Sequence, residues 1–251
     1  TMNNKYILCI ITISVSLFGS ESVTTHDDST ITDSIPETGT HQATPSMPVT
    51  TNPATQSLRT LYINKPEIVK KRIQQQRADL SQLNINNLDG LATISDLKNE
   101  NVVALSLYNN PLAAIKKEDF QGFAHLGTLA LNDAQISSIE PGSFAPLSKL
   151  QVLYLKNNPL VTITSAQLAG LNNLQTLYLN NTNLKGIGAD AFASTPNLKS
   201  LHLNDNKLTD FDPQIIAHLK QLKTLNLKNN PINSDNISAL RKRFPQVTII
   251  F

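Results

Sequence analysis

Residues 150–173 read LQVLYLKNNPLVTITSAQLAGLNN, and the apolar positions of this stretch return every 24 residues. Six copies in a single phase begin at residue 102, and a seventh, unfinished copy begins at Gln246. The copies open at Val102, Leu126, Leu150, Leu174, Leu198 and Leu222. A strict period of this length is typical of a solenoid, in which one supersecondary unit is stacked on the next.

Each copy follows the pattern L-x-x-L-x-L-x-x-N-x-L, which the quoted stretch represents with Leu150, Leu153, Leu155, Asn158 and Leu160. The two leucines of L-x-L share one face because side chains alternate along a strand. One such strand cannot bury its apolar face alone, whereas parallel stacking of neighbours closes a continuous core. Because a fully buried leucine contributes about 1.5–3 kcal/mol, the repeat predicts a stable fold.

The asparagine position lies where the chain turns out of the strand and leaves backbone groups without ladder partners. An amide side chain donates and accepts, so it can bind turn backbone in its own unit and in the adjacent one. Four copies carry the asparagine, as Asn110, Asn158, Asn206 and Asn230. The other two copies have Ala134 and Thr182 at this position. An unsatisfied buried polar group costs about 1–3 kcal/mol. We therefore expect a water or a shifted turn near Ala134 and a weak point at residues 131–136.

These residues resemble the leucine-rich-repeat superfamily. The repeat length and the recurring Phe120, Phe144 and Phe192 are similar to the typical extracellular subclass, which is found in Toll-type receptor ectodomains and small leucine-rich proteoglycans. The resemblance covers about residues 102–251 and implies an α/β repeat solenoid, a right-handed curved horseshoe. It implies a parallel sheet on the concave side and short helices, 3-10 turns or extended segments on the convex side. It also implies protein recognition, the usual role of the family.

Two segments of distinct composition precede the repeats. Residues 1–22 have the charged start, apolar centre and small-residue exit of a secretory signal peptide, with an uncleaved anchor as the alternative. The apolar run from Tyr6 to Phe18 is short for a membrane span, which needs about 20 residues. Residues 23–60 are rich in Ser, Thr and Pro and predict a disordered tether, either O-glycosylated or unmodified. We therefore expect a secreted or cell-surface protein with no membrane span in the mature chain.

Residues 61–101 predict an N-terminal helical cap followed by a degenerate repeat. Pro66 suits the first position of a helix. The basic run at residues 70–72 would give the end of the solenoid the polar cover that it needs, and binding to an acidic surface is the alternative. In the degenerate repeat, residues 80–85 imitate a strand, after which Leu88 breaks the register.

The array itself is expected over residues 102–251, as six repeats and a terminal strand that includes Ile249. The only cysteine, Cys9, lies in the predicted signal peptide, so the mature chain would contain no disulfide. Most extracellular families that the repeats resemble seal both ends with disulfide-rich caps, and this chain departs from them.

Charge and motif content exclude several classes of function. From residue 61 onward the chain has 19 Lys+Arg and 14 Asp+Glu, a net charge of +5. A nucleic-acid-binding domain would show a strong basic stripe, so we do not expect a nucleic-acid partner. Catalysis needs a nucleophile with a base, paired carboxylates or metal ligands held convergently, and no such motif occurs. The histidines have no partner at metal-ligand spacing; they are His26, His41, His125, His202 and His218. We expect a non-enzymatic protein without a metal or cofactor.

Outward positions of successive strands form columns across the sheet, with neighbouring strands about 4.8 Å apart. The fifth position of the repeat places Tyr154, Tyr178 and His202 on three adjacent strands. Tyrosine is enriched at binding hot spots, whereas the simpler explanation is that exposed strands favour aromatic residues. We predict a partner-binding face on the concave side that consists of Tyr108, Tyr154, Lys156, Tyr178, Asn180, His202, Asn204 and Asp205.

The sequence leaves open what binds this face. The resemblance favours a protein partner, bound by a monomer. One alternative is an adhesion or structural protein that binds surface glycans or the cell envelope, and a second is an inhibitor that wraps an enzyme. Glycosylation sequons begin at Asn180 and Asn236, and a glycan on Asn180 would obstruct a protein partner on this face.

Overall fold

The computed structural model describes residues 55–99 and 102–251, which form one unit from Thr55 onward. The predicted signal peptide, Cys9 and most of the predicted tether lie outside the described residues. In the part of the chain that is described, no helix is both long and apolar enough to cross a membrane.

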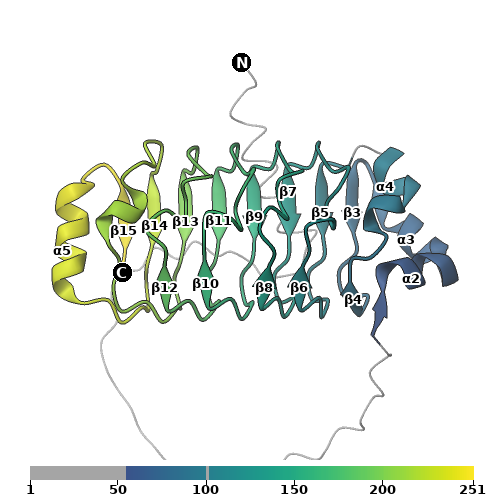
Figure 1. Cartoon of the computed structure of the whole chain (residues 1–251), viewed down its shortest axis with the longest axis horizontal. Helices are drawn as coiled ribbons and strands as arrows, with labels where there is room; N and C mark the ends of the chain where they lie inside the picture. Colours follow the sequence, from purple (N-terminus) through teal and green to yellow (C-terminus); the bar gives the residue numbers. More distant parts are fainter. Residues whose placement is uncertain (1–54, 100–101) are drawn as a thin grey trace, which may run out of the picture. The chain divides into compact units, whose positions relative to one another are not determined.

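A nine-stranded sheet extends from one end of this unit to the other (Figure 1). Its neighbours pair in parallel, except the first two strands, which are antiparallel. From β5 onward the register is offset by one repeat, so Leu129 lies opposite Leu153, and Leu153 lies opposite Leu177. The strands in order are β2 (Ile73–Gln74), β3 (Arg77–Asp79), β5 (Ala104–Ser106), β7 (Thr128–Ala130), β9 (Val152–Tyr154), β11 (Thr176–Tyr178), β13 (Ser200–His202), β14 (Thr224–Asn226) and β15 (Thr248–Ile250). The expected repeat solenoid with its parallel sheet is confirmed.

The opposite side of the array is mostly extended chain and turns. Two-residue strands pair there in parallel, as β6 (Ala114–Ile115) with β8 (Ser138–Ile139) and β10 (Thr162–Ile163) with β12 (Gly186–Ile187). Within residues 102–251, helical structure is confined to the 3-10 helix η2 (Pro213–Ile216) and to α5 (Ser234–Arg243). The family resemblance implied short helices, 3-10 turns or extended segments on the convex side. Extended segments predominate there.

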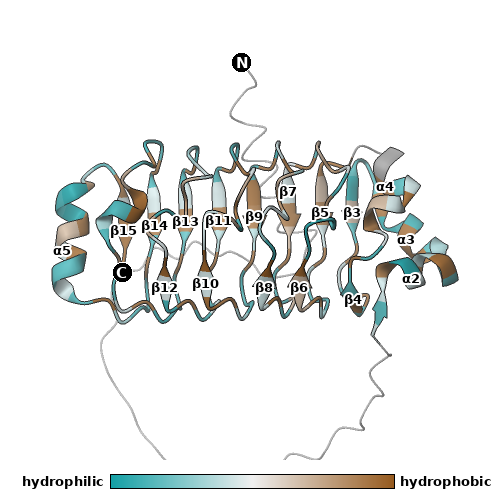
Figure 2. Cartoon of the chain, viewed as in Figure 1, coloured by the Kyte–Doolittle hydropathy of each residue, from teal (hydrophilic) through white to brown (hydrophobic). Residues whose placement is uncertain are grey.

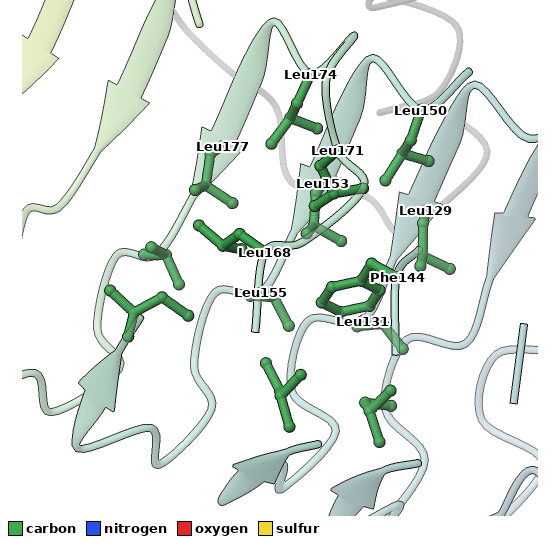
Figure 3. Close-up of a cluster of buried hydrophobic side chains, with 14 of the residues drawn as sticks. Leu129, Leu131, Phe144, Leu150, Leu153, Leu155, Leu168, Leu171, Leu174 and Leu177 are labelled. Atoms are coloured by element: carbon green, nitrogen blue, oxygen red, sulfur yellow. The ribbon is translucent and has the colours of Figure 1, made fainter. Parts of the chain in front are cut away.

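The core lies between the sheet and these outer segments. Figure 3 shows the repeated leucines of three neighbouring repeats pointing into one continuous space, together with Phe144. Leu153, Leu155 and Leu168 are completely buried. The rings of Phe120 and Phe144, one repeat apart, stack with centroids 5.8 Å apart. Each repeat therefore packs mainly against its two neighbours, as stacking of incomplete units requires.

Helices cover both ends of the sheet (Figure 1). At the N-terminal end are α2 (Leu58–Asn64), α3 (Pro66–Lys71) and α4 (Ser95–Asn99), together with the 3-10 helix η1 (Leu91–Thr93). Helix α3 begins at Pro66, as expected, and buries Val69. At the other end, α5 is mainly hydrophilic (Figure 2) and buries Leu240. Each end thus places a polar outer surface over its last core layer.

The ordered cap starts before the expected boundary at residue 60. The short strand β1 covers Gln56–Ser57 and pairs with β4 (Ile85–Asn87), and α2 follows at once. Ser57 caps α2, because its hydroxyl accepts a bond of 3.1 Å from the backbone N–H of Thr60. Leu58 is completely buried. The tether prediction was therefore wrong for residues 55–60, because one buried leucine anchors a stretch whose composition is otherwise polar.

The degenerate first repeat is longer than the others, and its strand lies earlier than predicted. Ala78 in β3 pairs with Leu105, 27 residues later, so β3 covers Arg77–Asp79 rather than residues 80–85. Leu80 is completely buried at the end of this strand. The repeat was misread because a small alanine holds the central strand position that leucine holds elsewhere. The additional three residues lengthen the outer part of the unit, which contains η1 and α4.

Buried asparagine side chains connect the turns of neighbouring repeats. The Asn158 Oδ1 atom accepts the N–H groups of Ala134 and Ile136 at 3.1 and 2.9 Å. Its Nδ2 atom donates to the carbonyl oxygens of Leu131 and Leu155 at 2.7 and 2.8 Å. Asn158 is 1% exposed. Each asparagine therefore satisfies the turn of the preceding repeat as well as its own strand.

Other groups replace part of the missing amide at Ala134 and Thr182. The Ala134 backbone carbonyl accepts the Leu112 N–H of the preceding turn at 2.9 Å, and the Thr182 hydroxyl donates to the Leu179 carbonyl of its own strand at 2.8 Å. Both turns differ in shape from the others, because the following residues, Gln135 and Asn183, have φ of 56° and 61°. The shifted turn expected near Ala134 is therefore present, and the Ala134 carbonyl provides an acceptor in place of the missing amide.

We expect Asn158→Ala to lower the free energy of unfolding by at least about 3 kcal/mol, because several buried backbone groups lose their partner together. The measurement is urea denaturation of the full chain followed by circular dichroism. Asn173→Ala is the control, since Asn173 makes a single bond, to the Ser148 carbonyl, at an exposed position. Equal losses for the two variants would contradict the structural role of the buried amide.

Asp119 is a buried carboxylate in an outer turn. It is 4% exposed, and its Oδ2 atom accepts the Lys116 N–H at 2.7 Å. Burial raises the pKa of Asp119 from 3.8 to about 6. The folded state therefore retains a proton that the unfolded state releases between these values. Stability falls as the pH rises through this window, and the full cost is present above about pH 6.

Asp119→Asn should therefore stabilise the fold by about 2 kcal/mol near pH 7 and have little effect near pH 4, where aspartate is largely protonated in the folded state. The asparagine Oδ1 can still accept the Lys116 N–H. Urea denaturation at both pH values measures the difference. Asp212→Asn is the control, because Asp212 accepts the Gln214 N–H at 2.8 Å in an exposed turn. If Asp119→Asn raised the free energy of unfolding equally at the two pH values, the pKa of Asp119 would not be raised by burial.

Candidate partner-binding face of the sheet

The outward side chains of the sheet follow from the alternation along each strand. In β9, β11, β13 and β14 the central leucine is completely buried, whereas the residues on either side are half-exposed. The third and fifth positions of the repeat therefore point away from the core. We use the term sheet face for the outward side chains at positions three, five and seven of the repeats.

An aromatic stack lies at the centre of the sheet face. Tyr154, Tyr178 and His202 pair in register on β9, β11 and β13. The centroids of the two tyrosine rings are 4.7 Å apart with an interplanar angle of 5°, and those of Tyr178 and His202 are 4.4 Å apart at 13°. The ring spacing is close to the distance between neighbouring strands. The predicted juxtaposition of these three residues is confirmed, and their role in binding stays a prediction.

Burial keeps the ring stack uncharged. It raises the pKa of Tyr154, and the neighbouring Tyr178 adds to this rise. Burial also raises the pKa of Tyr178 and lowers the pKa of His202. At neutral pH the stack therefore consists of two phenols and a neutral imidazole. Such groups can donate and accept hydrogen bonds and can bury apolar area without the desolvation cost of a charge.

The stacking determines which parts of the rings remain for a partner. Where two rings stack, the facing surfaces are in contact with each other, so Tyr178 has a neighbour on both of its faces. What the stack offers is ring edges and the two phenol hydroxyls. This geometry suits shape-complementary packing and hydrogen bonding, and it provides little open ring face on which a flat ligand could stack.

The other predicted site residues are distributed around the stack. Lys156, Asn180 and Asn204 are half-exposed at the seventh position of the same three repeats. Tyr108 is also half-exposed, but it belongs to the first 24-residue repeat, two repeats before Tyr154, and the structure does not bring it into the stack. The predicted set therefore forms one group around the stack and one outlying tyrosine.

Asp205 has a structural role that the sequence analysis missed. Its Oδ1 atom accepts from Asn229 Nδ2 at 2.6 Å, and its Oδ2 atom accepts from Asn204 Nδ2 at 2.5 Å. It belongs to a column at position eight in which every residue has a positive φ, between 54° and 59°. The column consists of Asn109, Asp133, Asn157, Asn181, Asp205 and Asn229. Asn and Asp tolerate the left-handed region better than other residues with a side chain, so this composition was a readable signal.

The described residues contain no group of three or more His, Cys, Asp or Glu side chains that could hold a metal ion. His125 Nδ1 lies 3.2 Å from Lys149 Nζ, and His218 Nε2 is buried without a hydrogen-bond partner. These two histidines belong to other parts of the repeat than His202, which stacks on Tyr178. The histidines therefore do not converge on one site within the described part of the chain.

The lowered pKa of His202 leads to a pH-dependent stability. Because the folded state disfavours imidazolium, the unfolded state binds more protons as the pH falls below 6.5, and stability is lost on acidification. His202→Phe keeps a ring in the stack but cannot titrate. The stability of this variant relative to the wild type should increase between about pH 7.5 and pH 5.5. Asp119 is common to both proteins, so its opposite contribution cancels.

Urea denaturation of the two proteins at both pH values provides the measurement. The control is His125→Phe, at an exposed position outside the stack. A constant difference between wild type and His202→Phe across this range would show that the imidazole is not held neutral by burial.

Comparisons with known proteins agree with this geometry. The Leucine rich repeat family model matches residues 100–160, 124–184 and 172–232, which together are more than half of the chain. No curated protein matches it. A solved structure described as a TLR13–ssRNA13 complex is similar, with 29% identity and a TM-score of 0.59 over 64% of this chain and 22% of TLR13.

A mouse RP105/MD-1 complex is similar at 23% identity, with a TM-score of 0.56 over 70% of this chain and 29% of the matched chain, and this likeness concerns the fold alone. The chain thus spans less than a third of either neighbour. The family match covers the same repeats that build the sheet and its outward columns. This chain belongs to the leucine-rich repeat family.

Proposed function

We propose that this chain is a non-enzymatic recognition module of a secreted or cell-surface protein, and that it binds a protein partner through the sheet face on its concave side. The observation that carries the proposal is the stack of Tyr154, Tyr178 and His202 in the middle of that face. Rigid aromatic side chains lose little conformational entropy on binding, and tyrosine is enriched at hot spots. Burial in a partner interface is the most direct use of such a group.

The similar solved structures support recognition as a class of function. One is a complex of TLR13 with ssRNA13, and the other is a complex of RP105 with MD-1. Neither assigns a ligand to this chain, which spans only a part of each. The ring geometry favours a protein over a glycan, because sugars bound by aromatic residues pack on an open ring face and Tyr178 has none.

The first experiment locates the partner's contact. A photo-crosslinking amino acid replaces Tyr178 in the full chain. The protein is incubated with the cell surface on which it naturally occurs, and the cross-linked products are identified by mass spectrometry. The matched control carries the same amino acid at Val161, which is 52% exposed on the outer side of the repeats. We expect a partner protein to be captured from Tyr178 and not from Val161; capture from Val161 alone would refute the proposal.

The second experiment measures the contribution of the rings. A hot-spot residue contributes at least about 2 kcal/mol, so Tyr154→Ala combined with Tyr178→Ala should weaken binding of the captured partner at least about 100-fold. Isothermal titration calorimetry gives the affinity, and circular dichroism shows that the double variant remains folded. Unchanged affinity in a folded double variant would show that the stack is not the recognition site.

A further inference from the structure

From β7 to β14 the strand segments of the sheet carry positive charge and no negative charge. The strand segments at positions two to seven read GTLALN, QVLYLK, QTLYLN, KSLHLN and KTLNLK from Gly127 to Lys228. They contain four lysines and no Asp or Glu. The acidic residues of the same repeats all lie in the turns and outer segments, at Asp133, Glu140, Asp190, Asp205, Asp210, Asp212 and Asp235. These strand segments therefore have a purely positive charge, whereas the turns and outer segments contain both signs.

Three of the lysines flank two neighbouring strands, β13 and β14, in the C-terminal half of the sheet. Lys199 and Lys223 occupy the same position in neighbouring repeats, where strands β13 and β14 begin. Lys228 follows the other end of β14, about 16 Å along the strand from Lys223 at 3.3 Å per residue. Lys199 and Lys223, at position two beside the sheet face, and Lys228, at position seven within it, therefore lie along the strands on either side of His202 and Asn226.

Within residues 55–99 and 102–251, no acidic partner lies against the amines of these three lysines, whereas Lys116 pairs with Asp89 at 3.3 Å. Lys199 Nζ donates to the neutral Gln175 Oε1 at 3.0 Å, and Lys223 and Lys228 are exposed. The nearby Asp205 carboxylate already accepts from two asparagine amides. Like charges on adjacent strands are destabilising, so a ligand that supplies carboxylates at this place would relieve the repulsion.

We propose that the partner of the sheet face is an acidic polypeptide, whose carboxylates pair with Lys199, Lys223 and Lys228 while an uncharged part of it packs on the Tyr154–Tyr178–His202 stack. This inference rests on the proposed function and specifies the chemistry of the partner. Charge complementarity of this kind increases the association rate and excludes basic partners.

The same features disfavour a nucleic acid. Single-stranded nucleic acids bind by stacking their bases on open aromatic faces along a basic groove. Here the central ring, Tyr178, has both faces occupied by its neighbours, and the lysines lie at the two ends of the strands rather than in a continuous track. Carboxylates spaced along a polypeptide match this arrangement better than a regular phosphate backbone.

The test uses the full chain and a fluorescein-labelled poly-L-glutamate, with poly-L-lysine and single-stranded poly-U RNA as comparison probes. The site variant is Lys199→Gln, Lys223→Gln and Lys228→Gln together. The matched control removes the same charge from exposed lysines outside the strands, as Lys185→Gln, Lys207→Gln and Lys242→Gln. Fluorescence anisotropy at low and physiological salt gives the affinity, since screening weakens exposed charge pairs.

We expect poly-L-glutamate to bind the wild type, the site variant to bind it at least about 10-fold more weakly, and the control variant to change affinity less than about 3-fold. Equal losses in the two variants would overturn the inference, as would poly-U binding that is tighter than poly-L-glutamate binding and depends on the same lysines.

The outcome separates this inference from the proposed function. If the captured partner depends on Tyr154 and Tyr178 but binds the lysine site variant normally, the module binds through its sheet face and its partner is not recognised by acidic groups. If poly-L-glutamate depends on the site lysines but the partner cross-links only from Val161, the basic site is present and the proposed recognition face is wrong.

Discussion

Parallel pairing with an offset of one repeat is the constraint on which the other features of this protein depend. Because each strand from β7 onward lies in register with the strand 24 residues before it, a residue type that recurs at one position becomes a column in space. Leucine columns form the core, and the columns between them form the sheet face. A register slip of one residue would exchange these two sets, so the leucines that stabilise the fold also keep the aromatic stack on the surface.

The polar interior obeys the same constraint. The amide of Asn158 binds backbone groups of its own repeat and of the repeat before it, so the satisfaction of each turn depends on its neighbour. At Ala134, where the amide is absent, the backbone carbonyl accepts the Leu112 N–H of the preceding turn instead. Stability in such an array is a sum of nearest-neighbour contributions, and a buried amide is one of the groups through which neighbours are coupled.

The sheet face combines a neutral centre with charged flanks. The rings of Tyr154, Tyr178 and His202 are held by stacking and are kept uncharged by burial. Lys199, Lys223 and Lys228 lie where β13 and β14 begin and end, while the acidic residues of the same repeats are confined to turns and outer segments. An apolar centre with a polar periphery is the usual anatomy of a protein interface. In this face the periphery is positively charged.

The sequence by itself determined the features that depend on a fixed period and on local alternation. These are the stacked repeats, the buried L-x-L strands, the asparagine column and the alignment of Tyr154, Tyr178 and His202. It could not locate β3, the strand of the degenerate first repeat, because Ala78 lacks the leucine signal and its position is determined by pairing with Leu105. It also assigned residues 55–60 to a tether, since the burial of Leu58 depends on a core that composition does not reveal.

Only the tertiary structure decided how these groups meet. The tyrosine rings of neighbouring repeats contact each other, and the Asp205 carboxylate accepts from Asn229 of the next repeat. The Ala134 carbonyl accepts the Leu112 N–H of the repeat before it. The period brings such residues into neighbouring columns. Side-chain rotamers, turn conformation and burial then select the bonds that form, and these depend on the packed neighbours rather than on the local sequence.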